Sequence, residues 1–404
     1  MTALAPRPQP LGALPWPAGM LLLPDVAGAD VLAGDLAVGR EPAAWPEGTE
    51  HVQHALVGDL DAAVAAVPGD DVVSRFNRAV LVGGAGVWES LATDTEGELN
   101  ALVRTAAYSV GITDEPPEYA GSTGEIAAMV GSARAAAAIE EGDAVGAAAE
   151  LATAVTAATE AGSPLFAASL VLTRTEILRE HLDDAATAAR EADAMIRGLP
   201  LSTPRELRAE LQVARALSRQ ALAGTDKGAL LAVVADLTEA VKILREDTHP
   251  EMFATINEQL ALAYLMMPMN DEADRIRLGV AVTSLRAALR VFTPETHPVA
   301  WSSAQLNLAN ALQYLPSVHQ EQNLDEAVHL YEEVLSYRDE FVDPVGAARV
   351  LLNQGNALGH LGAFVDADEK LGRARALFER AGESEGVVTA DGLLAEVAAA
   401  RAGA

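Results

Sequence analysis

The sequence contains no cysteine among its 404 residues. Without thiols there is no disulfide, no cysteine nucleophile, no iron–sulfur cluster and no cysteine-built zinc site. Lysine is also scarce, since only Lys227, Lys242 and Lys370 contribute to the 28 basic residues. The 28 basic and 58 acidic residues together give a net charge of −30. The clustered basic surface that nucleic acid or an anionic membrane requires is therefore not expected.

Aromatic residues make up only 4% of the chain, and long hydrophobic runs are missing. The apolar patch Met20–Leu23 is cut off by Pro24 and Asp25. No run approaches the ~20 apolar residues of a membrane span, so we expect a cytoplasmic protein. Half of the sequence is hydrophobic, mostly alanine, leucine and valine. This mixture favours closely packed helices over sheets, which select β-branched and aromatic residues. At roughly 150 residues per domain, the length predicts two to three domains.

The C-terminal half of the sequence repeats. Thr248-His249-Pro250 recurs 48 residues later as Thr296-His297-Pro298. The run 307–312 recurs in part over 353–358 at an offset of 46. Repeats of this length indicate stacked supersecondary units, each of which buries its apolar face against its neighbours.

Each repeat reads as two helices. The first is expected to begin at a proline, with Thr248 as N-cap and Glu251 completing a capping box. The second carries apolar residues at helical spacing. These residues are Leu278, Val282, Leu285 and Leu289 in one repeat and Leu324, Val328, Tyr331 and Leu335 in the next. Small residues, among them Ala309 and Gly355, stand where two helices must approach closely.

The repeats resemble the tetratricopeptide repeat. The clearest unit runs over 353–362, as Asn-Gln-Gly-Asn-Ala-Leu-Gly-His-Leu-Gly, followed by Ala367, Leu371 and Ala374. Residues 308–312 match the same pattern in the preceding unit. The resemblance covers about residues 200–390 and extends weakly to about 125. It implies an all-α fold, a right-handed α-solenoid of stacked antiparallel helix pairs, with an irregular Pro/Gly-rich N-terminal arm.

Three regions are expected along the chain. Residues 1–50 are rich in proline and glycine and are expected to form an extended arm. Residues 51–120 are expected to form a divergent helical cap, and residues 121–404 the repeat array. The two extra stretches between paired helices, around 267–277 and 315–323, lengthen two repeats beyond the usual ~34 residues.

Two glycine motifs have a catalytic or binding interpretation beside a structural one. The run 80–86, Val-Leu-Val-Gly-Gly-Ala-Gly, resembles a phosphate-binding turn but lacks the full dinucleotide spacing and a Gly-Lys-Ser/Thr. Gly382-Glu-Ser-Glu-Gly386 matches the nucleophile elbow formally but lacks the strand that must precede it. For both, a turn between helices is the favoured interpretation.

Histidine offers one further candidate. His51 and His54 lie three residues apart and would share a helical face on which a metal could be held. They lack an obvious third ligand apart from Glu50. His249 and His297 are expected at helix starts rather than as ligands. The sequence therefore predicts no metal and no cofactor.

The resemblance places function in a concave groove lined by the first helix of each pair. Carried over residue by residue, it assigns eight residues in pairs spaced four apart, so that both members of a pair project from one helical face. The predicted groove residues are Arg215, Arg219, Leu262, Met266, Asn310, Tyr314, Asn356 and His360. For Leu262 and Met266 the competing interpretation is plain core, and for the asparagines it is a hydrogen bond to the adjacent repeat.

The predicted function is a non-catalytic protein–protein interaction module, a scaffold, adaptor or assembly factor that binds a partner through this groove. The net charge of −30 favours a basic partner protein or peptide. A homo-oligomer is left open. The alternative is a regulatory sensor that binds a small peptide or metabolite within the superhelix.

Overall fold

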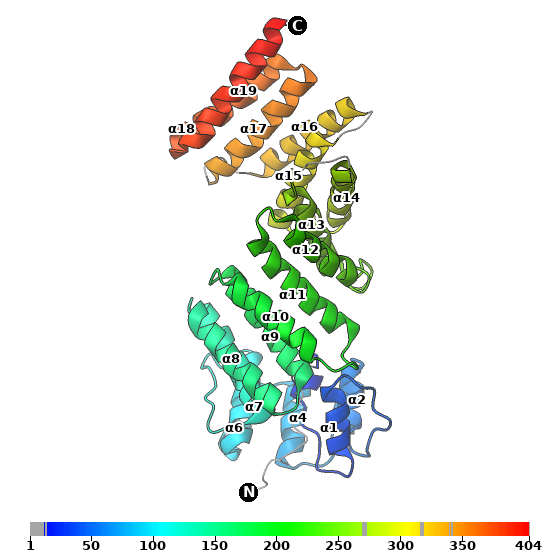
Figure 1. Cartoon of the computed structure of the whole chain (residues 1–404). Helices are drawn as coiled ribbons and strands as arrows, with labels where there is room; N and C mark the ends of the chain where they lie inside the picture. The colour runs from blue at the N-terminus through cyan, green and yellow to red at the C-terminus, as the bar shows by residue number, and fades with distance from the viewer. Residues whose placement is uncertain are drawn as a thin grey trace. The chain divides into compact units, whose positions relative to one another are not determined.

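The computed structural model describes residues 12, 14–268, 273–315, 319–338, 340 and 342–403, with only the backbone described over 273–275. Every regular element within these ranges is a helix, and most helices pack against the next helix in the sequence (Figure 1). The chain is thus an all-α array of stacked antiparallel helix pairs. It divides into two compact units, Met1–Leu222 (unit 1) and Ala223–Ala404 (unit 2).

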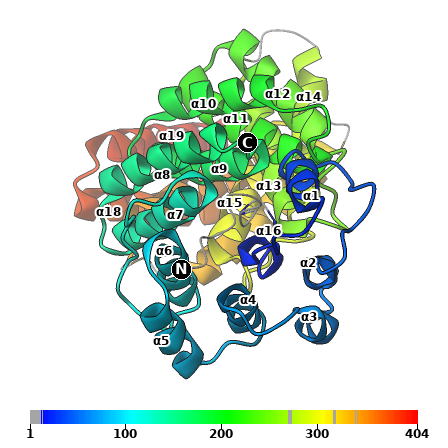
Figure 2. The ribbon, with the colours of Figure 1, turned by 90° about the horizontal axis from the view of Figure 1, so that it is seen from below.

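Unit 1 begins irregularly and ends in regular pairs. Its elements are η1 (Ala18–Met20), α1 (Ala29–Ala37), α2 (Glu50–Leu56), α3 (Leu60–Ala66), α4 (Val72–Val82), α5 (Ala85–Asp94), α6 (Gly97–Ser109), α7 (Gly124–Glu140), α8 (Ala144–Glu160), α9 (Pro164–Glu180), α10 (Ala185–Gly198) and α11 (Arg205–Ala223). Figure 2 shows α2 to α6 following one another in an arc that leads into α7. Helix α1 packs back onto α9.

The expected N-terminal arm lies in part outside the described residues, and its described part is anchored in the core. Residues Leu21, Leu22 and Leu23 are buried. The Leu22 amide donates to Asn77 Oδ1 at 2.8 Å, and Asn77 Nδ2 donates to the Leu22 carbonyl at 2.8 Å. An asparagine side chain here takes the place of a neighbouring strand, because it satisfies both backbone groups of a buried extended residue. The apolar patch Met20–Leu23 is therefore a core segment.

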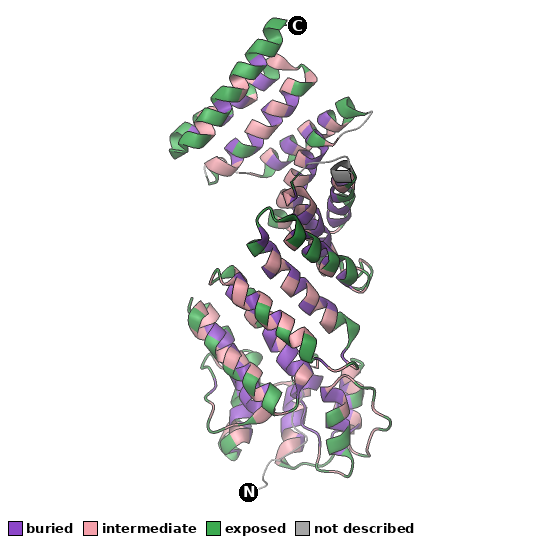
Figure 3. Ribbon diagram, viewed as in Figure 1, coloured by how far each residue is buried: buried purple, intermediate pink, exposed green. Residues whose placement is uncertain are grey.

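Unit 2 is the regular part of the array. Its helices are α12 (Lys227–Ala240), α13 (Pro250–Met266), α14 (Ala273–Ala288), α15 (Pro298–Tyr314), α16 (Gln320–Tyr337), α17 (Pro344–Leu361), α18 (Phe364–Ala381) and α19 (Ser384–Gly403). Successive first helices α13, α15, α17 and α19 also contact one another. In Figure 3 the exposed surface is most extensive on α19, at the end of the array.

The predicted small residues occupy the closest approaches between helices. Ala309 is fully buried. A Cβ added to Gly355 would lie 2.7 Å from Leu371 Cγ and 3.3 Å from the Ala367 carbonyl oxygen. Glycine is therefore required sterically between α17 and α18. The apolar stripes predicted for the second helices are also confirmed, since Leu285 and Tyr331 at their centres are fully buried.

The helix starts differ by one residue from the expected caps. The N-caps of α13 and α15 are His249 and His297, each followed by proline at the first helical position. The prediction of Thr248 as N-cap is wrong. The fixed φ of Pro250 places the boundary directly before it, and the Thr248 hydroxyl instead contacts His249 Nδ1 at 3.0 Å. The helix-start role expected for both histidines is confirmed.

Candidate functional site

One face of α13, α15 and α17 carries most of the side chains predicted to line a groove, and we call it the first-helix face. It holds six of the eight predicted residues, namely Leu262, Met266, Asn310, Tyr314, Asn356 and His360. Arg215 and Arg219 lie on α11, at the end of unit 1. The two groups belong to different compact units and are therefore described separately.

Asn310 connects two successive repeats. Its Oδ1 accepts a hydrogen bond from Tyr331 Oη at 2.7 Å and another from Asn353 Nδ2 at 2.9 Å. Tyr331 also contacts Gln313 Oε1 at 3.2 Å. Burial raises the pKa of Tyr331, with the nearby Tyr314 as a smaller contribution, so the phenol stays a neutral donor. The amide oxygen of Asn310 is thus committed to the adjacent repeat, which is the alternative that the sequence left open.

Tyr314, Asn356 and His360 lie toward solvent. Tyr314 is 62% exposed although it follows the buried residues Leu312 and Gln313. Asn356 is half-buried and His360 is exposed. Among the described residues neither has a hydrogen-bond or ionic partner through its side chain. Their polar groups are available to a ligand.

Arg349 extends this row and was missed at the sequence level. It lies on α17, seven residues before Asn356 and eleven before His360, so the three side chains occupy one narrow helical stripe. Arg349 is exposed and forms no ion pair or hydrogen bond with any described residue. Most described arginines are paired with a carboxylate, as Arg338 is with Asp343 at 2.8 Å. Arg349 shares this unpaired state with only a few described arginines, among them Arg380.

Leu262 and Met266 are half-buried on α13. One turn before Leu262, Glu258 is only 7% exposed. Burial raises the pKa of Glu258, and a hydrogen bond with Ser303 of the next first helix opposes this in part. The face therefore becomes more apolar at α13 than at α17.

In unit 1, Arg215 and Arg219 are directed to Asp193. Arg215 Nη1 lies 2.8 Å from Asp193 Oδ1, and Arg219 Nη2 lies 3.5 Å from the same atom. Arg197 contacts the other carboxylate oxygen. Desolvation would raise the pKa of Asp193, but hydrogen bonds from Arg215 and Arg197 outweigh it and hold the pKa below its ordinary value. Both predicted groove arginines thus join α10 to α11.

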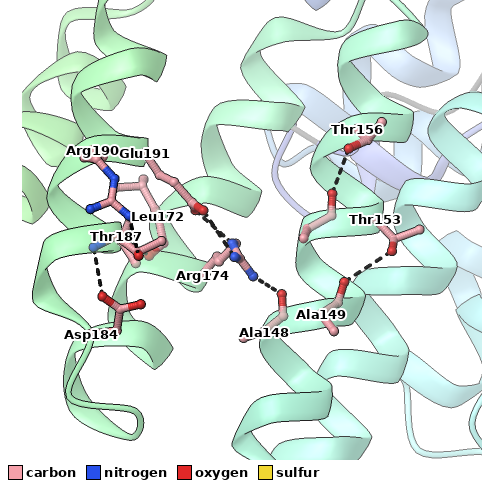
Figure 4. Close-up of polar contacts among 12 residues, drawn as sticks. Ala148, Ala149, Thr153, Thr156, Leu172, Arg174, Asp184, Thr187, Arg190 and Glu191 are labelled. Atoms are coloured by element: carbon pink, nitrogen blue, oxygen red, sulfur yellow. Dashed lines mark hydrogen bonds and ion pairs between the residues drawn. The ribbon is translucent and has the colours of Figure 1, made fainter.

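Arg174 has the same role one pair earlier, as Figure 4 shows. Its Nε donates to Glu191 Oε2 at 2.8 Å, its Nη2 donates to Glu191 Oε1 at 3.1 Å, and its Nη1 contacts the Ala148 carbonyl. One half-buried guanidinium thereby ties α8, α9 and α10 together. Paired arginines of unit 1 are therefore primarily structural, because a bidentate fork fixes the orientation of both partners.

The other sequence candidates resolve as turns or core contacts. Gly83 is the C-cap of α4 and Gly84 the N-cap of α5. Gly382 ends α18 in the left-handed conformation, and Ser384 begins α19. The turn interpretation is confirmed for both motifs. His51 is fully buried, and its Nε2 lies 3.1 Å from Asn77 Nδ2 and 3.2 Å from the Leu22 carbonyl oxygen.

Neither a metal-binding cluster nor a membrane-spanning helix is found in the described part of the chain. No group of three or more histidine, aspartate or glutamate side chains there is arranged to hold a metal ion. Among the helices as far as they are described, none has the length and apolar character needed to cross a bilayer.

Similarity to known proteins is confined to structure. No known family matches the sequence, and no curated protein matches it either. Among solved structures, the apo form of RapI is similar over 87% of this chain and 92% of its own, with 12% sequence identity and a TM-score of 0.41. The function of this chain must therefore be inferred from its own side chains.

Proposed function

We propose that the protein is a non-catalytic binding module, a scaffold or adaptor, that holds a segment of a partner protein against the first-helix face of unit 2. The observation that carries the proposal is the unpaired, exposed Arg349 in line with Asn356 and His360 among the described residues. A guanidinium fork recognises a carboxylate, and an asparagine amide supplies both donor and acceptor to a peptide backbone. We expect this binding to take place in the cytoplasm.

Exposed apolar groups supply the second part of the recognition. Tyr314 offers a half-apolar ring with a polar tip, a type of side chain enriched at binding hot spots. Half-buried Leu262 and Met266 continue the surface on α13. A matching partner segment carries an apolar side chain for this end and a carboxylate for Arg349. The net charge of −30 favours basic residues elsewhere in the partner and predicts association that weakens as salt rises.

The proposal is tested by affinity capture of partners from an extract of the source cells at low salt, followed by binding measurements with the purified partner. The variant R349A/N356A removes two side chains that form no hydrogen bond or ion pair with the described residues, so we expect the fold to be retained. Arg380→Ala is the matched control, because Arg380 is exposed and has no partner in the described part of the chain, on the second helix α18. We expect the double variant to bind about 10-fold or more weakly, equivalent to ~1.4 kcal/mol, and R380A to bind normally.

Two outcomes contradict the proposal. If all variants bind the same partner equally, the contact lies elsewhere on the molecule. If no protein is captured, a partner-binding role is wrong. The alternative of a sensor for a small peptide or metabolite is favoured by one separate observation, a cavity in unit 1.

A further inference from the structure

Unit 1 contains a cavity of about 640 Å³ beside its N-terminal segment. One wall is the chain around Leu14, Trp16 and Met20, and the others are α6, α7 and the start of α9. Small-molecule sites commonly have volumes of ~300–1,000 Å³. The cavity is therefore large enough for a compact organic ligand.

The apolar wall of this cavity is aromatic and thioether in character. Trp16, Tyr108 and Phe166 contribute rings, and Met20 and Met129 contribute sulfur. Trp16 is 49% exposed, whereas Phe166 and Met129 are buried. The buried side chains of this wall are thus apolar, and an indole lies near solvent. Aromatic faces attract cations, most strongly when the ring is that of tryptophan.

The charged side chains that line the cavity in the described residues are both acidic. They are Asp114, after α6, and Glu140, at the end of α7. Neither forms an ion pair or hydrogen bond with a described residue. Their field reaches the cavity wall, because the pKa of Tyr108 is raised first by burial and then by the charges of Glu140, Glu141 and Asp114. Two carboxylates in the lining favour a cationic group in the cavity over an anionic one.

The hydroxyl groups along α6 reinforce this polarity. Thr105 Oγ1 donates to the Ala101 carbonyl at 2.7 Å, and Ser109 Oγ donates to the Thr105 carbonyl at 2.8 Å. Each hydroxyl donates its single proton to a backbone carbonyl of α6, so it can act toward the cavity only as a hydrogen-bond acceptor. Acceptors, carboxylates and aromatic rings all favour the same kind of ligand.

We infer that this cavity binds a small organic cation, an amine with an apolar body. The ammonium group lies toward Asp114 and Glu140, and the apolar body packs against Trp16, Tyr108 and Phe166. Anionic ligands are rejected, because no basic side chain among the described residues lines the cavity. This inference does not depend on the function proposed for the first-helix face of unit 2.

The inference is tested on the full chain by isothermal titration with three probes of similar shape. These are 2-phenylethylamine, its neutral counterpart 2-phenylethanol and the anion 3-phenylpropionate. We expect the amine to bind at least about 10-fold more tightly than the alcohol, and the anion not to bind. Equal affinity for amine and alcohol, or no binding of the amine, overturns the inference.

Variants locate the binding. We expect D114N/E140Q to bind 2-phenylethylamine at least about 10-fold more weakly than the unmodified chain. The matched control E160Q/E383Q removes two exposed carboxylates that do not line the cavity and leaves affinity unchanged. Equal losses in both variants would show a general effect of net charge and contradict the proposed site.

Discussion

Asn353 on α17 donates from its Nδ2 to the Oδ1 of Asn310 on α15 at 2.9 Å, across 43 residues of sequence. The same oxygen accepts the Tyr331 hydroxyl of α16. Three consecutive helices therefore share one amide oxygen. The Oδ1 of Asn310 is therefore used within the array, whereas Asn356, at the equivalent position of the next repeat, forms no side-chain hydrogen bond with a described residue.

Asn310→Ala should destabilise unit 2 by about 1–3 kcal/mol, because it leaves the buried Tyr331 hydroxyl and the Asn353 amide without their shared acceptor. Hydrogen exchange of α15 to α17, followed by mass spectrometry, measures the loss. Asn307→Ala on the same helix is the control, since Asn307 has no hydrogen bond through its side chain with the described residues. Equal effects of the two substitutions would mean that the shared acceptor contributes nothing specific.

Gly355→Ala should cost about 1–3 kcal/mol, because the added Cβ would lie 2.7 Å from Leu371 Cγ. The matched control is Gly372→Ala on the partner helix α18, where no atom lies within 4 Å of the added Cβ. We expect this substitution to stabilise the chain by ~0.5–1 kcal/mol through helix propensity. Thermal unfolding by circular dichroism distinguishes the two signs. A neutral Gly355→Ala would show that α17 and α18 separate easily.

Glu258→Gln should stabilise unit 2 at neutral pH by about 1 kcal/mol, the usual scale for relieving one buried charge. Burial raises the pKa of Glu258 in the folded state, so the folded chain binds a proton more readily than the unfolded chain. Its contribution is fully present below the unfolded pKa and is lost as pH rises through the folded one. Unfolding midpoints of both proteins between pH 4 and pH 8 should therefore diverge as pH increases. Glu251→Gln, in the exposed first turn of the same helix, is the matched surface substitution.

Unit 1 should lose stability as pH falls below about 6.5, the ordinary pKa of histidine. Burial lowers the pKa of His51, so between the folded and the unfolded pKa the unfolded chain is protonated at this residue and the folded chain is not. Stability is then complete above the unfolded pKa and declines toward the folded one. An NMR titration of the ring protons should show His51 titrating below the ordinary pKa of histidine. His51→Gln should flatten the dependence of the unfolding midpoint on pH. An unchanged slope in His51→Gln would assign the effect to other groups.

The sequence was sufficient for the helical pairs, because their pattern is local. Apolar spacing at Leu278–Leu289 and prolines at helix starts depend on neighbours within a few turns. The one-residue error at Thr248 has the same local scale, since proline fixes the boundary directly before itself. The absence of cysteine excluded thiol chemistry, and the excess of acidic residues argued against a general basic surface.

Only the tertiary structure decided which polar groups meet. Arg215 and Arg349 are both arginines on helices, yet one is paired with Asp193 and the other has no partner among the described residues. That difference depends on how neighbouring helices pack, which no periodicity encodes. The cavity likewise needs Trp16, Asp114 and Phe166 together, from segments up to 150 residues apart. Helix formation is a property of adjacent residues, whereas a site is made by distant ones that packing brings into contact.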